Sequence, residues 1–205
     1  MQAINLNFPM PMKSNNVKDI LEQQLRLYGE LSEDDITKGL DFFKLRLFKK
    51  EELLIKAGET CNWICFIASG IVRNYYISNK GEAVTYCITF PMNFITAYSS
   101  FISGEKTFEN IHALTDLEVL TIEKKHLNEL NTSSHWLKFS KHFAEQSYVM
   151  MENRLLALQM ESAQNRYAEL LSKNPEFVQQ VPLKYLSSYL GITQRHLSRL
   201  RKNIS

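Results

Sequence analysis

Apolar residues recur at helical spacing near the start of the chain. Leu21, Leu25 and Tyr28 lie three or four residues apart and therefore share one face of a helix. Ser32 and Asp35 have the spacing of a capped helix start, in which the serine hydroxyl accepts a hydrogen bond from a free backbone N–H. The pattern predicts helices up to about residue 50.

From Leu53 to Ile122 the pattern changes to short runs rich in Ile, Val, Tyr, Phe and Thr. Turn-forming sequences separate the runs, at Ala57–Glu59, Ser69–Gly70, Ser78–Gly81 and Ser103–Gly104. Several runs alternate as strands do, for example Trp63–Ile67 and Val84–Ile88. The region is predicted to form a small antiparallel barrel or sandwich.

The stretch from Ser134 to Gln159 contains no Gly or Pro and is predicted to be one long helix. Two adjacent apolar stripes repeat every seven residues along it: Trp136, Phe143, Met150 and Ala157, then Leu137, Ala144, Met151 and Leu158. One stripe can pack on the barrel and the other on a second copy of the helix. We assign Trp136, Phe143, Met150 and Ala157 to a homodimer contact. The alternative is a helix that packs only on its own domain.

The end of the chain, from Pro182 to Ser205, has the pattern of a helix-turn-helix. Pro182 suits the first turn of a helix, Gly191 suits a tight turn with positive φ, and Thr193 can cap a second helix. The expected contact between the helices consists of Leu186, Ser187, Leu190, Ile192, Leu197 and Leu200. The alternative is an ordinary helical hairpin within a larger core.

The second of these helices carries a polar and basic outward face. Its expected outward residues are Gln194, Arg195, His196, Ser198, Arg199, Arg201 and Lys202. Arg can donate two hydrogen bonds to guanine and Gln can pair with adenine, so Gln194, Arg195 and Arg199 are the candidate base readers. The candidate phosphate contacts are Lys184, Tyr185, Thr193, His196, Ser198 and Lys202.

The distribution of charge agrees with a DNA-binding end. The whole chain of 205 residues has a formal charge of +2. Residues 1–161 contain 17 basic and 20 acidic side chains, a net of −3, whereas residues 162–205 contain 7 and 2, a net of +5. A polar break at Glu161–Gln164 separates these parts. A small basic module behind a mildly acidic body is typical of a DNA-binding domain attached to a sensor.

Several other classes of protein do not fit the sequence. No apolar run approaches the roughly 20 residues that cross a bilayer, and the first residues lack a signal-peptide pattern, so we expect a cytoplasmic protein without membrane contact. Three cysteines, Cys61, Cys65 and Cys87, exclude a disulfide framework. We find no phosphate-binding glycine loop, metal-ligand cluster or nucleophile with a base, so we do not expect an enzyme.

Four segments resemble the Crp–Fnr family of bacterial regulators. They are IKAGE at Ile55–Glu59, FIASGIVRNYY at Phe66–Tyr76, NKGEAVTYCITF at Asn79–Phe90, and the helix-turn-helix. The resemblance implies an α+β fold with an N-terminal jelly-roll barrel of the cyclic-nucleotide-binding type and flanking helices, a long dimerisation helix, and a small C-terminal DNA-binding domain. We expect these parts at residues 1–133, 134–161 and 162–205.

The resemblance also implies a dimeric transcription regulator whose second helix enters the major groove of an inverted-repeat site. RNA polymerase would be a further partner if the protein activates transcription. Family members usually carry a β-hairpin wing after the helix-turn-helix. This chain ends at Ser205, so we expect any equivalent contact from around Glu176–Val181, or none. The alternative is a ligand-sensing dimer that acts through a protein partner. The basic outward face of the second helix argues against this alternative.

The phosphate-binding loop of cAMP-binding relatives is not matched. Those relatives carry Gly-Glu and then Arg-Ser, and the arginine neutralises the cyclic phosphate. Here the loop reads Pro91–Ala97, Thr107-Phe108 stands in place of Arg-Ser, and no arginine occurs between Arg73 and Arg154. We therefore expect no cyclic nucleotide binding of the usual kind.

The candidate effector pocket consists of Phe90, Phe94, Ile95, Tyr98, Thr107 and Phe108. Either another small molecule occupies it or its own aromatic side chains fill it. An iron–sulfur cluster needs four thiolates, one more than the chain has, and Cys61 and Cys65 fit buried strand positions. His112 and His126 are weak haem candidates. We therefore expect no cofactor and no metal.

Overall fold

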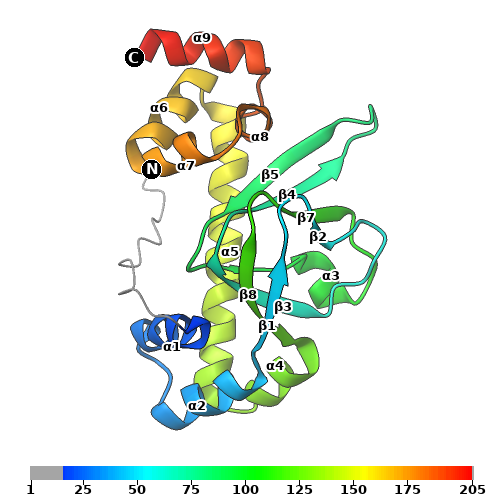
Figure 1. The fold of residues 1–205 in the computed structure, drawn as a ribbon, viewed down its shortest axis with the longest axis vertical. Coiled ribbons are helices and arrows are strands. Elements are labelled where there is room, and N and C mark those ends of the chain that lie inside the picture. Colours follow the sequence, from blue (N-terminus) through cyan, green and yellow to red (C-terminus); the bar gives the residue numbers. More distant parts are fainter. Residues whose placement is uncertain (1–15, 205) are drawn as a thin grey trace.

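The computed structural model describes residues 16–204 and places a β-barrel beside one long helix, with helices at both ends (Figure 1). Helices α1 (Val17–Tyr28) and α2 (Glu33–Phe42) precede the barrel. The long helix, α5 (Ser134–Met160), runs along the barrel to the C-terminal helices, and its predicted position is confirmed. The fold class is therefore the expected α+β arrangement.

Two antiparallel four-stranded sheets form the barrel. One has the order β1 (Lys44–Phe48), β8 (Leu117–Glu123), β3 (Trp63–Ser69) and β6 (Phe94–Ile95). The other has the order β2 (Leu53–Ile55), β7 (Glu109–Ala113), β4 (Val72–Ile77) and β5 (Ala83–Thr89). Helix α3 (Tyr98–Ser103) connects β6 to β7, and helix α4 (Lys124–Leu130) connects β8 to α5.

The N-terminal prediction is correct for the two helices and wrong for the residues that follow them. Asp35 N donates to Ser32 Oγ at 3.1 Å, so the predicted cap is present. The stretch predicted to stay helical up to about residue 50 instead turns into β1, which pairs with β8 in an antiparallel register. Its alternating sequence, from Lys44 to Phe48, fits a strand better than a helix.

The space between the sheets is filled by the chain's own side chains. The buried cluster there is mainly aliphatic and includes Ile67, Val72, Ile111 and Val119, each with no exposed surface. A second cluster on the outer face of the β1-β8-β3-β6 sheet packs this sheet against α1, α2, α4 and α5. The long helix is therefore joined to the outside of the barrel rather than to its interior.

The first half of the first apolar stripe of α5 packs inward, whereas Met150 of the same stripe is 47% exposed. Trp136 is 1% exposed, its Nε1 donates to the carbonyl of Asp35 at 3.0 Å, and a Cβ on Gly39 would lie 2.3 Å from its ring. Phe143 packs against Phe94 at a centroid distance of 5.9 Å. Assigning Trp136 and Phe143 to a dimer contact was therefore wrong, because both pack on their own domain.

Four short helices form the C-terminal end. They are α6 (Ala163–Lys173), α7 (Pro175–Gln180), α8 (Leu183–Tyr189) and α9 (Gln194–Ile204). A third buried cluster joins them to the barrel, since it contains Ile71, Ile88 and Leu114 as well as apolar residues of α6 to α9. The C-terminal helices therefore share a core with the barrel.

Candidate functional site

The last two helices have the geometry of a helix-turn-helix. Gly191 adopts φ +70° between α8 and α9, a left-handed conformation that favours glycine. Thr193 Oγ1 accepts a hydrogen bond from His196 N at 3.2 Å, which confirms the predicted cap of the second helix. Pro182 immediately precedes α8 rather than being its first residue, a difference of one position.

The predicted contact between the two helices is present. Leu186, Leu190, Leu197 and Leu200 are buried, and so is the small Ser187 where α9 approaches α8. Ile192 in the turn is half-buried beside them. The packing fixes which side of α9 faces inward, and the opposite side forms the surface at this end of the molecule.

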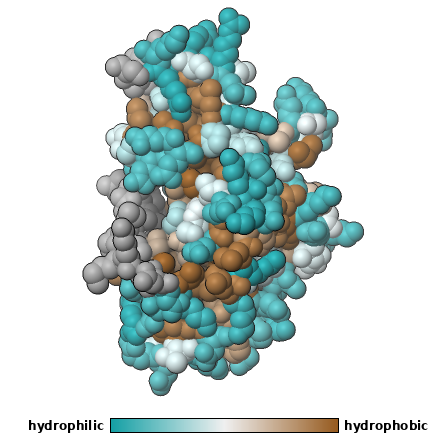
Figure 2. All heavy atoms as spheres, viewed as in Figure 1, coloured by the Kyte–Doolittle hydropathy of each residue, from teal (hydrophilic) through white to brown (hydrophobic). Residues whose placement is uncertain are grey.

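The outward surface of α9 is polar and basic. Figure 2 shows that hydrophilic residues cover the end of the molecule that α9 occupies. Gln194, Arg195, Ser198, Arg199 and Lys202 are all exposed. Within residues 16–204, neither arginine nor the lysine takes part in an ion pair. Carboxylates of the described residues therefore do not neutralise these cations.

The remaining residues expected at this surface are divided between exposed and packed positions. Thr193 and Lys184 are exposed, whereas His196 is half-buried. Arg201 does not point outward as predicted, because its Nη2 donates to the carbonyl of Val178 at 3.1 Å. Tyr185 faces the barrel, where the Arg73 guanidinium lies 4.2 Å from its ring centroid, which corrects its expected place among the phosphate contacts.

Two arginines that the sequence analysis missed join this module to α5: Arg154 belongs to α5, and Arg166 of α6 donates from its Nη1 to the carbonyl of Ala157 in α5 at 3.3 Å. Arg154 donates to the carbonyl of Tyr189 and stacks on its ring at 4.0 Å, and burial lowers the pKa of its guanidinium. Arg166 Nη2 donates to the carbonyl of Leu190 at 2.9 Å. Both carbonyls lie at the C-terminal end of α8, where helix carbonyls lack partners within the helix. In the sequence, the one feature that could have pointed to these arginines is that they lie on either side of the polar break at residues 161–164.

The barrel contacts α8 directly through the β4–β5 hairpin. Ser188 Oγ accepts a hydrogen bond from Thr85 N at 2.9 Å and donates to the carbonyl of Ala83 at 3.3 Å. Arg73 Nε also donates to Thr85 Oγ1 at 2.7 Å. The hairpin and the first helix of the motif are therefore linked by several polar contacts.

The structure does not bring the predicted effector pocket together. Phe94 and Tyr98 line a cavity, but Phe90 packs on Phe177 in the C-terminal core, and Ile95 lies inside the filled barrel. Two further residues lie elsewhere: Thr107 is buried and donates its backbone N–H to Glu59, and Phe108 is 90% exposed. The six residues therefore do not form one site, because they point to different sides of their strands and loops.

The candidate cofactor ligands occupy ordinary structural positions. Cys61 and Cys65 are both buried, Cys65 within β3 and Cys61 in the loop before it rather than on a strand as expected, and burial raises the pKa of Cys65 far above its usual value. His112 Nε2 lies 3.2 Å from a carboxylate oxygen of Glu51, and burial lowers its pKa. His126 stacks on Phe42. Among residues 16–204 there is no group of three side chains arranged to hold a metal ion.

The helices described, including the long α5, are too short or too polar to cross a membrane.

No protein with curated annotation shows significant sequence similarity to this chain. Residues 45–133 match the Cyclic nucleotide-binding domain family. This match covers the barrel and α4 and agrees with the jelly-roll arrangement of the two sheets.

Similar folds among solved structures extend over most of the chain. FixK2 from Bradyrhizobium japonicum aligns with a TM-score of 0.69 at 17% identity, covering 79% of this chain and 84% of that protein. A crp/fnr family transcriptional regulator from Eubacterium rectale aligns with a TM-score of 0.68 at 15% identity, covering 88% and 87%. The c-di-GMP responsive regulator CLP of Xanthomonas campestris aligns at 0.65 and 15% identity, covering 84% and 91%.

These similarities show the fold of the chain, a cyclic-nucleotide-binding-type barrel that a long helix joins to C-terminal helices arranged as a helix-turn-helix. This chain has the fold of the Crp/Fnr-type regulators, and the resemblance inferred from its sequence is confirmed at that level.

Proposed function

We propose that the protein is a sequence-specific DNA-binding transcription regulator that acts as a homodimer. The observation that carries this proposal is the face of α9, where Arg195, Arg199 and Lys202 are exposed and have no ion-pair partner in the described chain. Unneutralised cations on a protruding helix suit the phosphates and the base edges of the major groove.

The proposed base readers are Gln194, Arg195 and Arg199, which lie in the N-terminal half of α9 and have exposed side chains. The proposed phosphate contacts are Lys184, Thr193, His196, Ser198 and Lys202. Thr193 Oγ1 accepts its hydrogen bond from His196 N, so its hydroxyl hydrogen is free to donate to a phosphate oxygen. Ser198 Oγ donates its hydrogen to the carbonyl of Gln194, so it would have to exchange that bond for one to phosphate. This division predicts that the first group sets sequence preference and the second sets affinity.

The proposed dimer contact is the exposed stripe of α5 opposite the barrel. Ala144, Tyr148, Met151, Leu155 and Leu158 follow one another at alternating spacings of four and three residues, which is the repeat of a coiled coil. The last four are large and 41–68% exposed in the single chain. A second copy of α5 would cover them. A dimer would also present two copies of α9 to an inverted repeat.

The domain division proposed for this function keeps residues 1–133 as the sensor, 134–161 as the dimerisation helix and 162–205 as the DNA-binding domain. The absence of a basic side chain at Thr107-Phe108 supports a sensor that does not bind cAMP in the usual way. Nothing in the described residues suggests catalytic chemistry, and activation would require a further contact with RNA polymerase. The alternative, a dimer that acts through a protein partner alone, makes no use of the basic face of α9.

Selection of duplexes from a random DNA pool by the purified protein tests the proposal. We expect enriched sequences with two inverted half-sites whose centres lie one helical turn, or a multiple of it, apart. Enrichment of single half-sites would contradict the dimer. A pool that remains random after selection would contradict sequence-specific DNA binding.

A further inference from the structure

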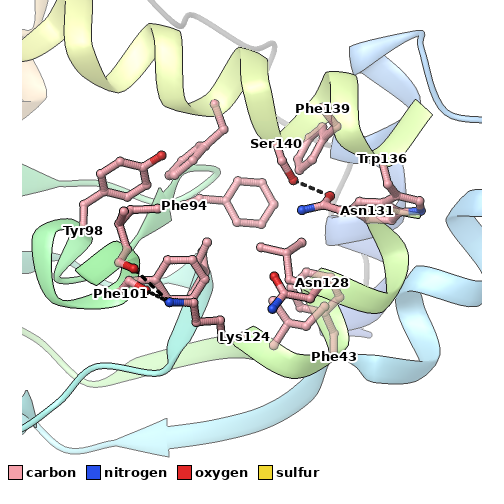
Figure 3. Close-up of a pocket in the computed structure, with 15 residues that line it drawn as sticks. Phe43, Phe94, Tyr98, Phe101, Lys124, Asn128, Asn131, Trp136, Phe139 and Ser140 are labelled. Carbon is pink, nitrogen blue, oxygen red and sulfur yellow. Dashed lines mark hydrogen bonds between the residues drawn. The ribbon is translucent and has the colours of Figure 1, made fainter. Parts of the chain in front are cut away.

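A cavity of about 180 Å³ lies outside the barrel, between the β1-β8-β3-β6 sheet and helices α3, α4 and α5 (Figure 3). It is distinct from the filled space between the two sheets. The exposed residues Ile102 and Asn128 are among its lining, so the cavity reaches solvent between α3 and α4. We propose that this cavity binds a small one-ring aromatic carboxylate. That this ligand acts as an effector of transcription rests on the function proposed above, whereas the binding itself does not.

The shape and lining of the cavity favour an aromatic ring. Its walls include seven aromatic residues from four parts of the chain: Phe43, Phe94, Tyr98, Phe101, Trp136, Phe139 and Phe143. Aromatic side chains favour ring ligands in offset or edge-to-face contact. An apolar protein cavity of about 150 Å³ is known to hold one benzene molecule, so this volume fits one ring with a short substituent.

The charge of the cavity favours a carboxylate on that ring. Among the described residues that line it, Lys124 is the one charged side chain. Lys124 Nζ donates to the carbonyls of Phe101 and Ile102, which hold the ammonium at the edge of the cavity. An ammonium has three N–H donors, so one remains for a ligand. A carboxylate would accept it as a charge-assisted hydrogen bond.

Neutral polar groups occupy the same side of the cavity. Asn128 belongs to α4, as Lys124 does, and Asn131 is the C-cap residue of that helix; Figure 3 shows Asn131 beside Ser140 of α5. The Asn131 side-chain carbonyl accepts a hydrogen bond from Ser140 at 2.8 Å, so it is already satisfied. The amide of Asn128 makes no such bond to its neighbours in the described chain and can donate to a second carboxylate oxygen. The ring then faces the aromatic wall and the carboxylate faces α4.

Binding at this site would act on the long helix. Phe139, Ser140 and Phe143 line the cavity from α5, and Phe94 contacts both of these phenylalanines edge to face, at 5.7 and 5.9 Å. A ring in the cavity therefore packs against the helix that carries the proposed dimer stripe and Arg154, which contacts the DNA-binding domain.

Calorimetric titration with benzoate, and with neutral benzyl alcohol for comparison, tests the inference. The fluorescence of Trp136, which lines the cavity, gives a local signal. We expect saturable benzoate binding that Lys124→Met weakens by about tenfold or more, with little change for benzyl alcohol. Lys125→Met is the matched control, because the Lys125 ammonium pairs with Glu123 on the surface and should leave both affinities unchanged.

A second variant guards against a folding defect in Lys124→Met. Ile102 is 60% exposed at the mouth of the cavity, so Ile102→Trp should fold and should block both compounds. Absence of saturable benzoate binding, or equal losses from Lys124→Met and Lys125→Met, would overturn the inference. Selected DNA is measured on the same samples. Intact DNA binding without benzoate binding would refute the proposed ligand site alone. Benzoate binding without DNA binding would refute the proposed function alone.

Discussion

The guanidinium of Arg73 lies 4.2 Å from the ring centroid of Tyr185, so a barrel strand and the first helix of the helix-turn-helix are in direct contact. The same guanidinium also lies 4.2 Å from the ring of Tyr75. Arg73 is therefore held between a ring of its own strand and a ring of α8. Burial lowers its pKa, and both rings favour the charged form through cation–π attraction. This contact helps to hold the C-terminal helices on the barrel.

Replacing Tyr185 with Leu should loosen this attachment. Loss of the cation–π contact is expected to weaken docking by about 1 kcal/mol and to expose the break after Glu161. Limited proteolysis with a glutamate-specific protease should then cleave the variant severalfold faster at that position. Tyr76→Leu is the control, since that ring lies near Tyr86 and not on α8. Equal cleavage rates for both variants would show that the stack does not hold the module.

The exposed stripe of α5 predicts a dimer that charge can disrupt. Met151→Glu combined with Leu155→Glu places carboxylates at the centre of the stripe, where burial in a dimer is unfavourable for charged groups. Sedimentation velocity should show a dimer for the natural sequence and a monomer for the variant. Gln159→Glu adds a charge on an exposed position outside the stripe and should remain dimeric. A natural sequence that sediments as a monomer would contradict the dimer.

Close contact between α2 and α5 predicts a steric defect at Gly39. A methyl group there would lie 2.3 Å from the Trp136 ring, so either the ring or the helix must shift. Gly39→Ala should lower the free energy of unfolding by about 1–3 kcal/mol in urea. Thr37→Ala, at an exposed position of the same helix, should have a much smaller effect. An unchanged unfolding midpoint for Gly39→Ala would mean that the two helices are not packed so closely.

The carboxylate of Asp35 predicts a pH-dependent term in stability. Burial alone would raise its pKa, but hydrogen bonds from Ser32, His135 and Ser133 outweigh burial and bring the pKa to about 2. Because the pKa is lower in the folded state than the ordinary value of 3.8, the stabilisation is complete above that value and disappears as the pH falls toward 2.

Urea unfolding at a series of pH values measures this term. Asp35→Asn should be less stable by about 2 kcal/mol at neutral pH, and the difference should shrink between about pH 4 and pH 2. Asp34→Asn, at an exposed neighbour, is the control. A difference that stays constant over this range would show that the charge of Asp35 is not responsible.

Much of the fold follows from local sequence patterns. Alternation predicted β3 and β5 but missed β1, the long run without Gly or Pro predicted α5, and Gly191 with Thr193 predicted the turn and cap of the last two helices. The two apolar stripes of α5 were also visible. Which stripe packs inward could not be predicted, because that depends on Gly39 of a distant helix leaving room for Trp136.

The sites were harder to predict than the fold because they combine distant segments. The cavity takes its lining from the barrel, α3, α4 and α5, so no single motif contains it. Helical periodicity placed Arg201 on the outward face of α9, but its guanidinium donates a hydrogen bond to the carbonyl of Val178 in another helix. Tyr185 looked available for phosphate, but Arg73 lies against its ring. Periodicity gives the face of a residue and not the partner that covers it.

Two substitutions on α9 separate sequence preference from affinity. Arg199→Ala should weaken binding to the selected duplex by about 1–3 kcal/mol and relax the preference at one base position. Lys202→Ala should weaken binding to all duplexes alike. Arg46→Ala removes an equal charge from an exposed position on β1 and should change neither. A uniform loss for Arg199→Ala in competition assays would make Arg199 a phosphate contact instead of a base reader.

The central claim is that the basic face of α9 binds DNA, and the salt dependence of binding to the selected duplex tests it most directly. Fluorescence anisotropy over a range of salt concentrations should give a logarithm of the binding constant that falls linearly with the logarithm of salt concentration. Lys202→Ala should reduce that slope by about 1, as expected for the loss of one phosphate contact. Weak binding that does not depend on salt would contradict the claim and would favour action through a protein partner.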